Sequence, residues 1–563
     1  MFQKDQDPES QRNLLLAIAL SLAVFIGWHL FYVSPRLAAE AERKKAEIAA
    51  NQARNQAPGA PGTVQGSTPS GTTAPGQSPT GGQAPAGQVA TRDAVIAQGP
   101  RHAIDTPSLK GSINLRGGRI DDLVLKTYRE AVSPTSPNVV LLSPGGSKDA
   151  YFTDFTWIPA TGSTFAVPGR DTVWTASGGT ALTPKTPVTL TWDNGQGLIF
   201  KRTISVDDRF LFTVKDEVEN KGSAPVALQH FARIFRLGTP KVEGWFILHE
   251  GMISVTGEKG LNEVTYADLA KDAETAQKAK KGDEGVRSFT AATGGWVGIT
   301  DKYWATAIVP DQKAKYDSRL VGFKKTAQQD EGHQADLLGG MVTIAPGTTG
   351  SNQVLVYAGA KEVKAIDSYM AQHNIALFDR LVDWGWFFWI TKPLFKIIDW
   401  LYGLLGNFGL AILAVTVLVK AAFFPLANKS YESMAKMKKL QPELERIRDL
   451  HKDDPMKQRT EMMELYKREK INPAAGCLPI LLQIPVFFAL YKVLFVTIDM
   501  RHAPFFGWIK DLSAADPTSI FNLFGLLPFS VPEFFQVGVW PILMGITMWI
   551  QMQLNPQQPD PIQ

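Results

Sequence analysis

The residues best placed for chemistry are polar side chains inside two apolar segments. Lys420 interrupts the apolar run from Phe408 to Leu426, and Thr416 precedes it by four residues, which places both on one face of a helix. Gln483 lies in a second apolar run, between two prolines. A bare cation in hydrocarbon is costly. Lys420 therefore either extends to the headgroups near the end of its helix or lines a hydrated cavity, and the residues leave both interpretations open.

The sequence contains none of the enzyme motifs that we searched for. It contains no His/Glu metal motif, no glycine-rich phosphate loop and no nucleophile elbow. Its one cysteine, Cys477, excludes an intramolecular disulfide and a cysteine-based metal cluster. The acidic pair Asp121 and Asp122 lies beside a turn and is predicted to be exposed. We expect no catalytic residue, no metal and no cofactor. Four isolated histidines are predicted to be structural: His29, His230, His373 and His502.

Four apolar stretches are long enough to cross a bilayer, which takes about 20 residues. They are Leu14–Val33, Phe408–Leu426, Cys477–Ile498 and Val537–Leu554. The first is longer than the apolar core of a signal peptide and ends in aromatic residues, so we interpret it as an uncleaved anchor, although Leu37-Ala38-Ala39 keeps cleavage open. In the third, Lys492 is expected to extend to the outer headgroups or toward Asp499.

The distribution of basic residues predicts the orientation. Residues 428–475 carry 12 Lys/Arg, whereas 499–533 carry two, Arg501 and Lys510. Short loops rich in Lys/Arg stay cytoplasmic. The first loop is therefore inside, the second is outside, and the large segment between the first two spans is outside. The charges around the first span favour the opposite orientation, but their asymmetry is smaller.

The segment outside the membrane begins with a linker and continues with β-structure. Between Arg54 and Arg92 there is no charged residue, and Gly, Pro, Ala, Gln, Ser and Thr dominate. Period-two patterns follow, for example LIFKRTISV (198–206) and FLFTVKDEVEN (210–220). Many short strands with turn signals predict a β-sandwich. Residues 258–287 are rich in Lys, Asp, Ala and Glu and are predicted to be a helical or loose insertion.

Residues 364–405 are aromatic but carry three charges and a proline within the apolar part: Lys392, Pro393, Lys396 and Asp399. These residues favour an amphipathic helix in the outer interface over a fifth span. Four tryptophans would then lie at headgroup depth: Trp384, Trp386, Trp389 and Trp400.

The cytoplasmic loop is predicted to be a hairpin of two helices. In the first, apolar residues recur every three or four positions. Asp454 and Pro455 are typical of the start of a second helix, which is predicted to end at about Lys470. The charged face of this hairpin is interpreted equally well as a surface exposed to solvent or as a docking surface for a partner. The apolar positions of the first helix include Tyr431, Met434, Met437, Leu440, Leu444, Ile447 and Leu450.

Three stretches resemble one known family. FFPLANKSYESMAKMKKLQPELERIR (423–448), EMMELYKREKINPAAGCLPILLQIPVFFALYKVL (461–494) and DMRHAPFFGWIKDLSAADP (499–517) are similar to the YidC family of membrane-protein insertases. The anchor and the large outer domain resemble the Gram-negative form. The resemblance implies a multi-domain membrane protein, in which an α-helical transmembrane bundle is joined to a periplasmic β-sandwich of the β-supersandwich kind.

The resemblance also implies a site and partners. Lys420, Thr416 and Gln483 would line a hydrophilic client-binding groove, open to the cytoplasm and lipid, whose positive charge attracts acidic residues of a client. The cytoplasmic hairpin, with Tyr431, Met434, Met437 and Tyr466, would meet the ribosome and targeting factors. Further implied partners are nascent membrane-protein clients, the Sec translocon with its accessory subunits, and the lipid bilayer, with no nucleic acid other than the ribosome's. The implied location is the bacterial inner membrane, multi-pass, with a cytoplasmic N-terminus.

The domain organisation follows from these elements. We expect an anchor (1–35), a flexible linker (36–92), a periplasmic β-sandwich domain (93–363), an interfacial helix (364–405), span 2 (406–427), the cytoplasmic hairpin (428–475), span 3 (476–499), a periplasmic loop (500–533), span 4 (534–556) and a truncated cytoplasmic end (557–563).

Two departures from the family pattern matter. Lysine stands at position 420 where arginine is commoner, which keeps the charge but loses the planar fork that grips a carboxylate with two hydrogen bonds. The family continues past the position of Asn555-Pro556 with two more spans and a basic tail, while this sequence reaches only Gln563. We therefore expect a truncated form whose groove lacks two helices.

The alternative function is a membrane-anchored periplasmic protein that binds or isomerises carbohydrate. It predicts that deletion of most of 94–360 abolishes function, whereas the insertase function predicts that much of this segment is dispensable. A transporter is disfavoured by the small number of spans and the lack of a repeat between them.

Overall fold

Alternating apolar and polar residues build a large β domain in the described chain. The computed structural model describes residues 90–240, 248–257, 260–280, 282, 284–325, 331–452, 454–469, 478–514, 516, 518–527, 531 and 537–554. The predicted anchor, nearly all of the predicted linker, His29 and residues 557–563 lie outside this part. A short helix, α3 (Arg92–Ile96), precedes the first strand.

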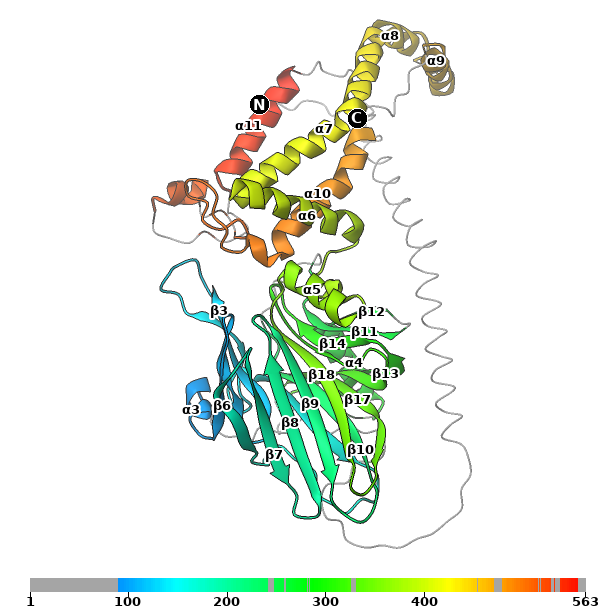
Figure 1. The fold of residues 1–563 in the computed structure, drawn as a ribbon. Coiled ribbons are helices and arrows are strands. Elements are labelled where there is room, and N and C mark those ends of the chain that lie inside the picture. The colour runs from blue at the N-terminus through cyan, green and yellow to red at the C-terminus, as the bar shows by residue number, and fades with distance from the viewer. Residues whose placement is uncertain are drawn as a thin grey trace, which may run out of the picture. The chain divides into compact units, whose positions relative to one another are not determined.

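Eighteen strands follow in the described residues (Figure 1). In chain order they are β1 (Arg101–Asp105), β2 (Leu109–Asn114), β3 (Arg119–Arg129), β4 (Asn138–Leu142), β5 (Tyr151–Pro159), β6 (Thr175–Thr183), β7 (Thr186–Asp193), β8 (Leu198–Val206), β9 (Leu211–Asn220), β10 (Val226–Leu237), β11 (Gly251–Thr256), β12 (Leu261–Thr265), β13 (Glu284–Thr293), β14 (Gly295–Thr300), β15 (Trp304–Val309), β16 (Lys315–Phe323), β17 (Gly332–Ile344) and β18 (Thr349–Ala360).

The strands form two series of antiparallel neighbours. One runs β12, β11, β14, β15, β18, β9, β8, β7, β6, and the other runs β2, β3, β5, β10, β17, β16, β13. β4 pairs with β3, and β1 joins the two series because it pairs with β2 and, in parallel, with β6. Along β8 side chains alternate between buried and partly exposed. The prediction of a β-rich domain is confirmed, and its two quoted stretches form β8 and β9.

The predicted insertion at 258–287 is part strand and part helix. β12 is followed directly by α4 (Tyr266–Lys278), and Thr265 caps this helix by accepting a hydrogen bond from the backbone N–H of Asp268 at 3.1 Å. Leu269 is buried, and a Cβ atom added to Gly285 on β13 would lie 2.1 Å from the Leu269 carbonyl oxygen. The missing side chain at Gly285 therefore allows the helix to pack directly on the sheet.

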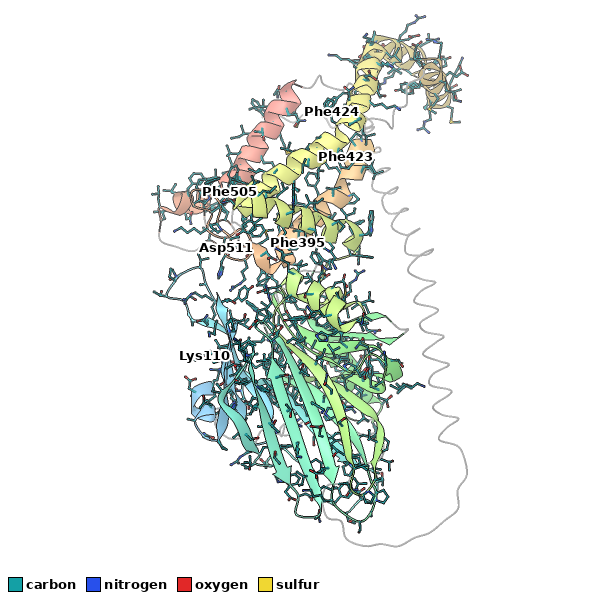
Figure 2. All side chains as sticks on the ribbon, in the orientation of Figure 1. Lys110, Phe395, Phe423, Phe424, Phe505 and Asp511 are labelled. Atoms are coloured by element: carbon teal, nitrogen blue, oxygen red, sulfur yellow. The ribbon has the colours of Figure 1, made fainter. Side chains whose placement is uncertain are left out.

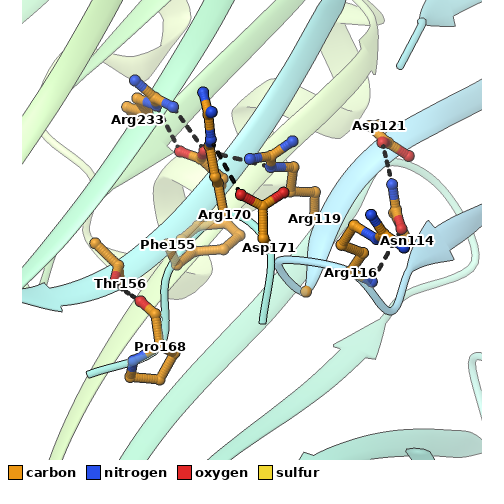
Figure 3. Close-up of polar contacts among 12 residues, drawn as sticks. Asn114, Arg116, Arg119, Asp121, Phe155, Thr156, Pro168, Arg170, Asp171 and Arg233 are labelled. Carbon is orange, nitrogen blue, oxygen red and sulfur yellow. Dashed lines mark hydrogen bonds and ion pairs between the residues drawn. The ribbon is translucent and has the colours of Figure 1, made fainter. Parts of the chain in front are cut away.

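Asp121 and Asp122 are buried, so the prediction that they are exposed was wrong. Asp121 accepts a hydrogen bond from Asn114 Nδ2 at 3.2 Å (Figure 3). It also pairs with Arg101, and Asp122 pairs with Arg92. Burial raises the pKa of Asp121, although the charge of Arg101 opposes this shift. Both arginines precede β2 in the sequence. A turn pattern depends on neighbouring residues only, so it could not indicate that these two arginines pair with the aspartates.

Arg202 and Asp216 form a fully buried ion pair between β8 and β9. Arg202 Nε donates to Asp216 Oδ1 at 2.7 Å, and its guanidinium lies 5.1 Å from the ring centroids of both Phe155 and Trp174. His230, predicted to be structural, has its Nε2 atom 2.7 Å from Asp216 Oδ2. Burial alone would raise the pKa of Asp216, but Arg202 and His230 hold it below its usual value.

A second buried pair lies on neighbouring strands (Figure 3). Arg233 on β10 donates to Asp154 on β5 from Nε at 2.7 Å and from Nη2 at 2.9 Å. Arg119 Nε approaches the same carboxylate at 3.6 Å. Burial would raise the pKa of Asp154, yet the nearby arginines lower it. Arg202 and Arg233 are therefore held in ion pairs inside the domain.

His333 makes the stability of the β domain depend on pH. Its ring is buried, and burial lowers its pKa to about 4 from an ordinary value near 6.5. Between these two pH values the unfolded chain binds a proton at this site that the folded chain does not, so folding stability falls as pH drops from about 6.5 to about 4. We expect His333→Gln to remove about 3 kcal/mol of this loss, measured by urea unfolding at several pH values. Parallel stability curves for the two proteins would contradict this prediction.

The segment predicted as one interfacial helix is divided into three elements. They are α5 (Val363–His373), the 3-10 turn η3 (Phe378–Leu381) and α6 (Phe388–Leu405). Left-handed backbone at Asn374 and Gly385 breaks the helical path between them. α5 packs on the β domain, where Ile366 is buried and Tyr369 hydrogen-bonds to Asp207.

Two charges of α6 are held by neighbouring elements. Lys392 Nζ contacts Asp367 of α5 at 2.8 Å and Asp379 of η3 at 2.9 Å, and Asp399 pairs with Lys364 at 2.9 Å. The exposed surface of α6 includes four large apolar residues: Trp389, Ile397, Trp400 and Leu404. Of the four tryptophans predicted to lie at headgroup depth, Trp384 is buried within the protein and donates its Nε1–H to the Asp379 carbonyl. Trp386 is exposed.

The remaining described elements are mainly helical. They are α7 (Phe408–Lys439), α8 (Gln441–Leu450), α9 (Pro455–Arg468), α10 (Leu478–Val496), η5 (Ile498–Met500), η6 (Ile520–Gly525) and α11 (Val539–Leu554). Within the described residues, α7 is the one helix long and apolar enough to cross a membrane; in α10 the apolar part is Leu481–Val496, and α11 has 16 residues. The described residues fall into two compact units, one within 90–430 and 478–516, the other within 431–469 and 518–554.

The predicted hairpin is built from the end of α7 together with α8 and α9. The apolar helix continues past Pro425 as far as Lys439, so no break separates it from the hairpin. Asp454 caps α9 by accepting a hydrogen bond from the backbone N–H of Lys457 at 3.0 Å, which confirms the predicted start of that helix. Arg468 donates to Glu443 at 2.8 Å and thereby links α9 to α8.

Candidate functional site

Thr416 and Lys420 lie on one side of α7, away from its buried positions. Ala411 and Val415 are buried, whereas Lys420 is exposed and Thr416 is partly exposed. Thr416 Oγ1 donates to the carbonyl of Ile412 at 2.8 Å, so its hydroxyl proton is satisfied within the helix and its oxygen can still accept a hydrogen bond. The helix therefore presents a cation and a hydroxyl oxygen one turn apart.

Lys420 lies next to α10. Its Nζ atom is 5.9 Å from the ring centroid of Phe487, which is at the outer limit of a cation–π contact. Gln483 precedes Phe487 by four residues and is partly exposed, so both lie on the same face of α10. Within the described part of the chain, no carboxylate lies at ion-pair distance from Lys420. Among the described residues, the lysine thus has an aromatic neighbour but no carboxylate partner.

The structure brings Lys420 to Phe487, and it forms no direct hydrogen bond between Lys420, Thr416 and Gln483 among the described contacts. Sequence reasoning missed Phe487. Its position four residues after Gln483 places it on the same helix face and could have indicated it. A phenylalanine in an apolar run, however, is not distinguished by residue type from its neighbours.

Prolines leave backbone acceptors near both polar faces. Pro425 in α7 has no N–H to donate to the carbonyl of Ala421, which adjoins Lys420. Pro485 in α10 likewise cannot donate to the carbonyl of Leu481, two residues before Gln483. Unpaired carbonyls inside an apolar helix are tolerated where protein or water bonds to them. Each helix therefore places, near a polar side chain, a carbonyl to which the proline four residues later cannot donate.

The outer ends of these two helices are held together by the chain after α10. A Cβ atom added to Gly409 of α7 would lie 2.0 Å from the ring of Phe505, so the ring occupies the space that a side chain would need (Figure 2). Asn407 Nδ2 also donates to the Pro504 carbonyl at 3.3 Å. The start of α7 is therefore fixed against the segment that follows α10.

Lys492 has a different partner from the one predicted. The prediction that it extends outward toward Asp499 was wrong, because its Nζ atom pairs with Asp383 at 2.8 Å and the residue is buried. Asp383 lies between η3 and α6, 109 positions away in the sequence. Local sequence patterns cannot identify a partner at this separation.

The four hairpin residues singled out from the sequence differ in exposure. Tyr431 is 57% exposed, and Met434 and Met437 are partly exposed along the end of α7. Tyr466 on α9 is buried beside the buried Leu465. Tyr466 is therefore part of the small core of the hairpin, and only the α7 residues are accessible to a partner. Lys436, Lys438 and Lys439 make this end of α7 basic.

Comparisons with known proteins identify the family. Residues 101–397 match the YidC periplasmic domain family, and residues 400–563 match the 60Kd inner membrane protein family. The membrane protein insertase YidC of Methylobacterium radiotolerans is 50% identical over 559 residues, covering 98% of this chain and 88% of that protein. The membrane protein insertase YidC of Brucella suis is 51% identical over 562 residues, covering 99% of this chain and 89% of that protein.

Among solved structures, an active YidC insertase crystal structure is 15% identical and covers 82% of this chain and 85% of its own, with a TM-score of 0.30. At a TM-score of this size the likeness supports no conclusion. The family is instead shown by the two family matches and by the identity of about 50% over nearly the whole chain. The chain belongs to the YidC family of membrane protein insertases.

Proposed function

We propose that this protein inserts membrane proteins into the bilayer and assists their folding, as the names of its relatives indicate for them. The structural observation that carries the mechanism is the cation of Lys420, which lies in an apolar helix without a carboxylate partner in the described chain. An unpaired cation at such a place is unfavourable unless water or a transient anion reaches it. An acidic residue of a client would supply that anion.

The proposed mechanism lowers the barrier to moving a polar tail across the membrane. Lys420 attracts an acidic side chain of the client, while Thr416 and Gln483 offer hydrogen bonds to its backbone. The client's apolar helix meanwhile moves along the lipid-facing side. No covalent bond is made or broken, so the proposed activity is not enzymatic.

The proposed location is the bacterial inner membrane, with several spans, a cytoplasmic N-terminus and the β-sandwich domain in the periplasm. The basic charge of residues 428–475 supports this orientation. The accessible, basic end of α7 is the proposed contact for the ribosome and targeting factors. The Sec translocon and its accessory subunits are further proposed partners.

Reconstitution tests this function directly. The protein in liposomes is expected to protect the translocated tail of a single-span client with a short acidic tail from added protease, well above the level in empty liposomes. The periplasmic carbohydrate-binding alternative predicts equal protection in both. Equal protection would therefore reject the insertase function. The degree of protection given by the wild-type protein is also the reference for the variants below.

A further inference from the structure

The outer part of α10 is fixed by an ion pair that no sequence pattern revealed. Lys492 Nζ lies 2.8 Å from Asp383 Oδ2, and the side chains are only 9% and 16% exposed. Losing one partner of a buried ion pair is costly because the other charge remains unpaired. The pair therefore resists any movement of α10 away from Asp383.

Asp383 is itself held from both sides. Its Oδ2 atom also accepts a hydrogen bond from the backbone N–H of His249 in the β domain at 2.8 Å, and Oδ1 accepts from the backbone N–H of Gly385 at 3.0 Å. Gly385 has a positive φ of 71°, and a Cβ atom there would lie 3.2 Å from Lys492 Cε. The stem of the lysine thus packs on a turn that favours glycine. Asp383 joins the β domain, the turn before α6 and α10.

A second contact fixes the same side of the helix one turn further on. Lys302, in the turn between β14 and β15, places Nζ 3.8 Å from the ring centroid of Phe495. The backbone N–H of Lys302 donates to Glu250 Oε1 at 3.1 Å. The neighbours His249 and Glu250 therefore support both contacts, so the β domain holds α10 at two points.

These contacts lie on the opposite side of α10 from the groove residues. A helix turns about 100° per residue, so Lys492 lies about 180° around the axis from Gln483. Fixing Lys492 against the β domain thus fixes the rotation of α10 that directs Gln483 and Phe487 toward α7. A small rotation about the axis would move Phe487 away from Lys420.

We propose that Asp383 and Lys492 are positioning residues for the client groove, a role that rests on the proposed function. The β domain, through this pair, sets the rotation of α10 and so keeps the groove face opposite Lys420. This inference also changes the expectation that much of 94–360 is dispensable, because deleting that segment removes both His249 and Lys302. Loss of activity on deletion would then reflect a misplaced helix and not a sugar-binding role.

The test uses the full chain in liposomes with Asp383→Asn, Lys492→Gln and the double variant that combines them. Lys396→Gln is the matched control, because it removes an ion pair of α6 with Asp367 from a lysine side chain that is 59% exposed. Each single variant is expected to lower client insertion by about fivefold or more, the double variant to be no less active than the worse single variant, and the control to stay near wild type.

A structural readout separates positioning from general damage. In a Cys477→Ser background, cysteines at positions 420 and 487 are joined by a short bifunctional thiol reagent, and the yield reports whether the two faces meet. The yield is expected to fall in the single variants and to fall no further in the double variant. Phe495→Leu, a milder change, is expected to lower it less.

Three outcomes would overturn the proposal. The first is an unchanged cross-linking yield in Asp383→Asn. The second is a reduced yield with normal insertion, because rotation would then not matter for clients. The third is a double variant in which the losses of the two single variants add up, because the two residues would then not act as a pair. Insertion by the wild-type protein in the same vesicles reports on the proposed function separately.

Discussion

Lys420→Glu is expected to reduce the insertion of clients with acidic tails by at least about tenfold, and Lys420→Arg to leave it close to wild type. Two unit charges 4 Å apart interact by about 4 kcal/mol at an effective dielectric constant near 20. Reversing one charge turns this attraction into repulsion, and a tenfold change needs only about 1.4 kcal/mol. The measurement is the initial rate of protease protection of the client tail in liposomes.

Two controls separate charge attraction from damage to the protein. Lys429→Glu makes the same change nine residues further along α7 at an exposed position and is expected to have little effect. A client whose acidic tail residues are replaced by asparagine is expected to insert equally well with either residue at 420. If Lys420→Glu lowered the insertion of both clients by the same factor, attraction of acidic residues would not be the role of this lysine.

The arginine variant addresses the departure from the family pattern. Arginine can grip a carboxylate through two parallel hydrogen bonds, whereas lysine acts as a compact point charge. A rate for Lys420→Arg near that of the wild type would mean that charge alone drives the step.

Features encoded by neighbouring residues were predictable. LIFKRTISV forms β8 over the whole predicted range, because period-two alternation is a property of the strand itself. Asp454 and Pro455 marked the start of α9 for the same reason, since a cap acts on residues two or three positions away. Lys420 and Thr416 were recognised because a polar residue in an apolar run is visible without any structure.

Features that depend on distant partners were not predictable. Asp121 was predicted to be exposed because it lies beside a turn, and its partner Arg101 is 20 positions away in the sequence. The charges of α6 indicated an interfacial helix, but their partners Asp367 and Asp379 lie in elements that the sequence pattern had merged into the same helix. The contacts of Lys420 with Phe487 and of Lys492 with Asp383 likewise join segments far apart in the chain. A candidate site could thus be placed on α7, but not completed across α10.

The substitution with the largest expected effect on stability lies in the core of the β domain. Asp216→Asn removes the negative charge that pairs with Arg202 and bonds to His230, and all three residues are buried. Breaking a buried pair by removing one partner typically costs about 3–5 kcal/mol. We expect a loss of this size in the free energy of unfolding, measured by urea denaturation at pH 7. Lys201→Gln breaks a partly exposed pair with Glu219 on the same two strands and is expected to leave the midpoint nearly unchanged.

The pH dependence and a double variant identify the cause of that loss. The pKa of Asp216 is lowered in the folded protein, so its contribution is present above the unfolded value near 4 and is lost as pH falls through the folded value. The difference between wild type and Asp216→Asn is therefore expected to be constant near neutral pH and to shrink in acid. Replacing both partners by apolar residues, Arg202→Met with Asp216→Leu, is expected to recover much of the stability, because no unpaired charge remains. A double variant as unstable as Asp216→Asn would mean that the pair stabilises the core by its own attraction, and not only by avoiding a buried unpaired arginine.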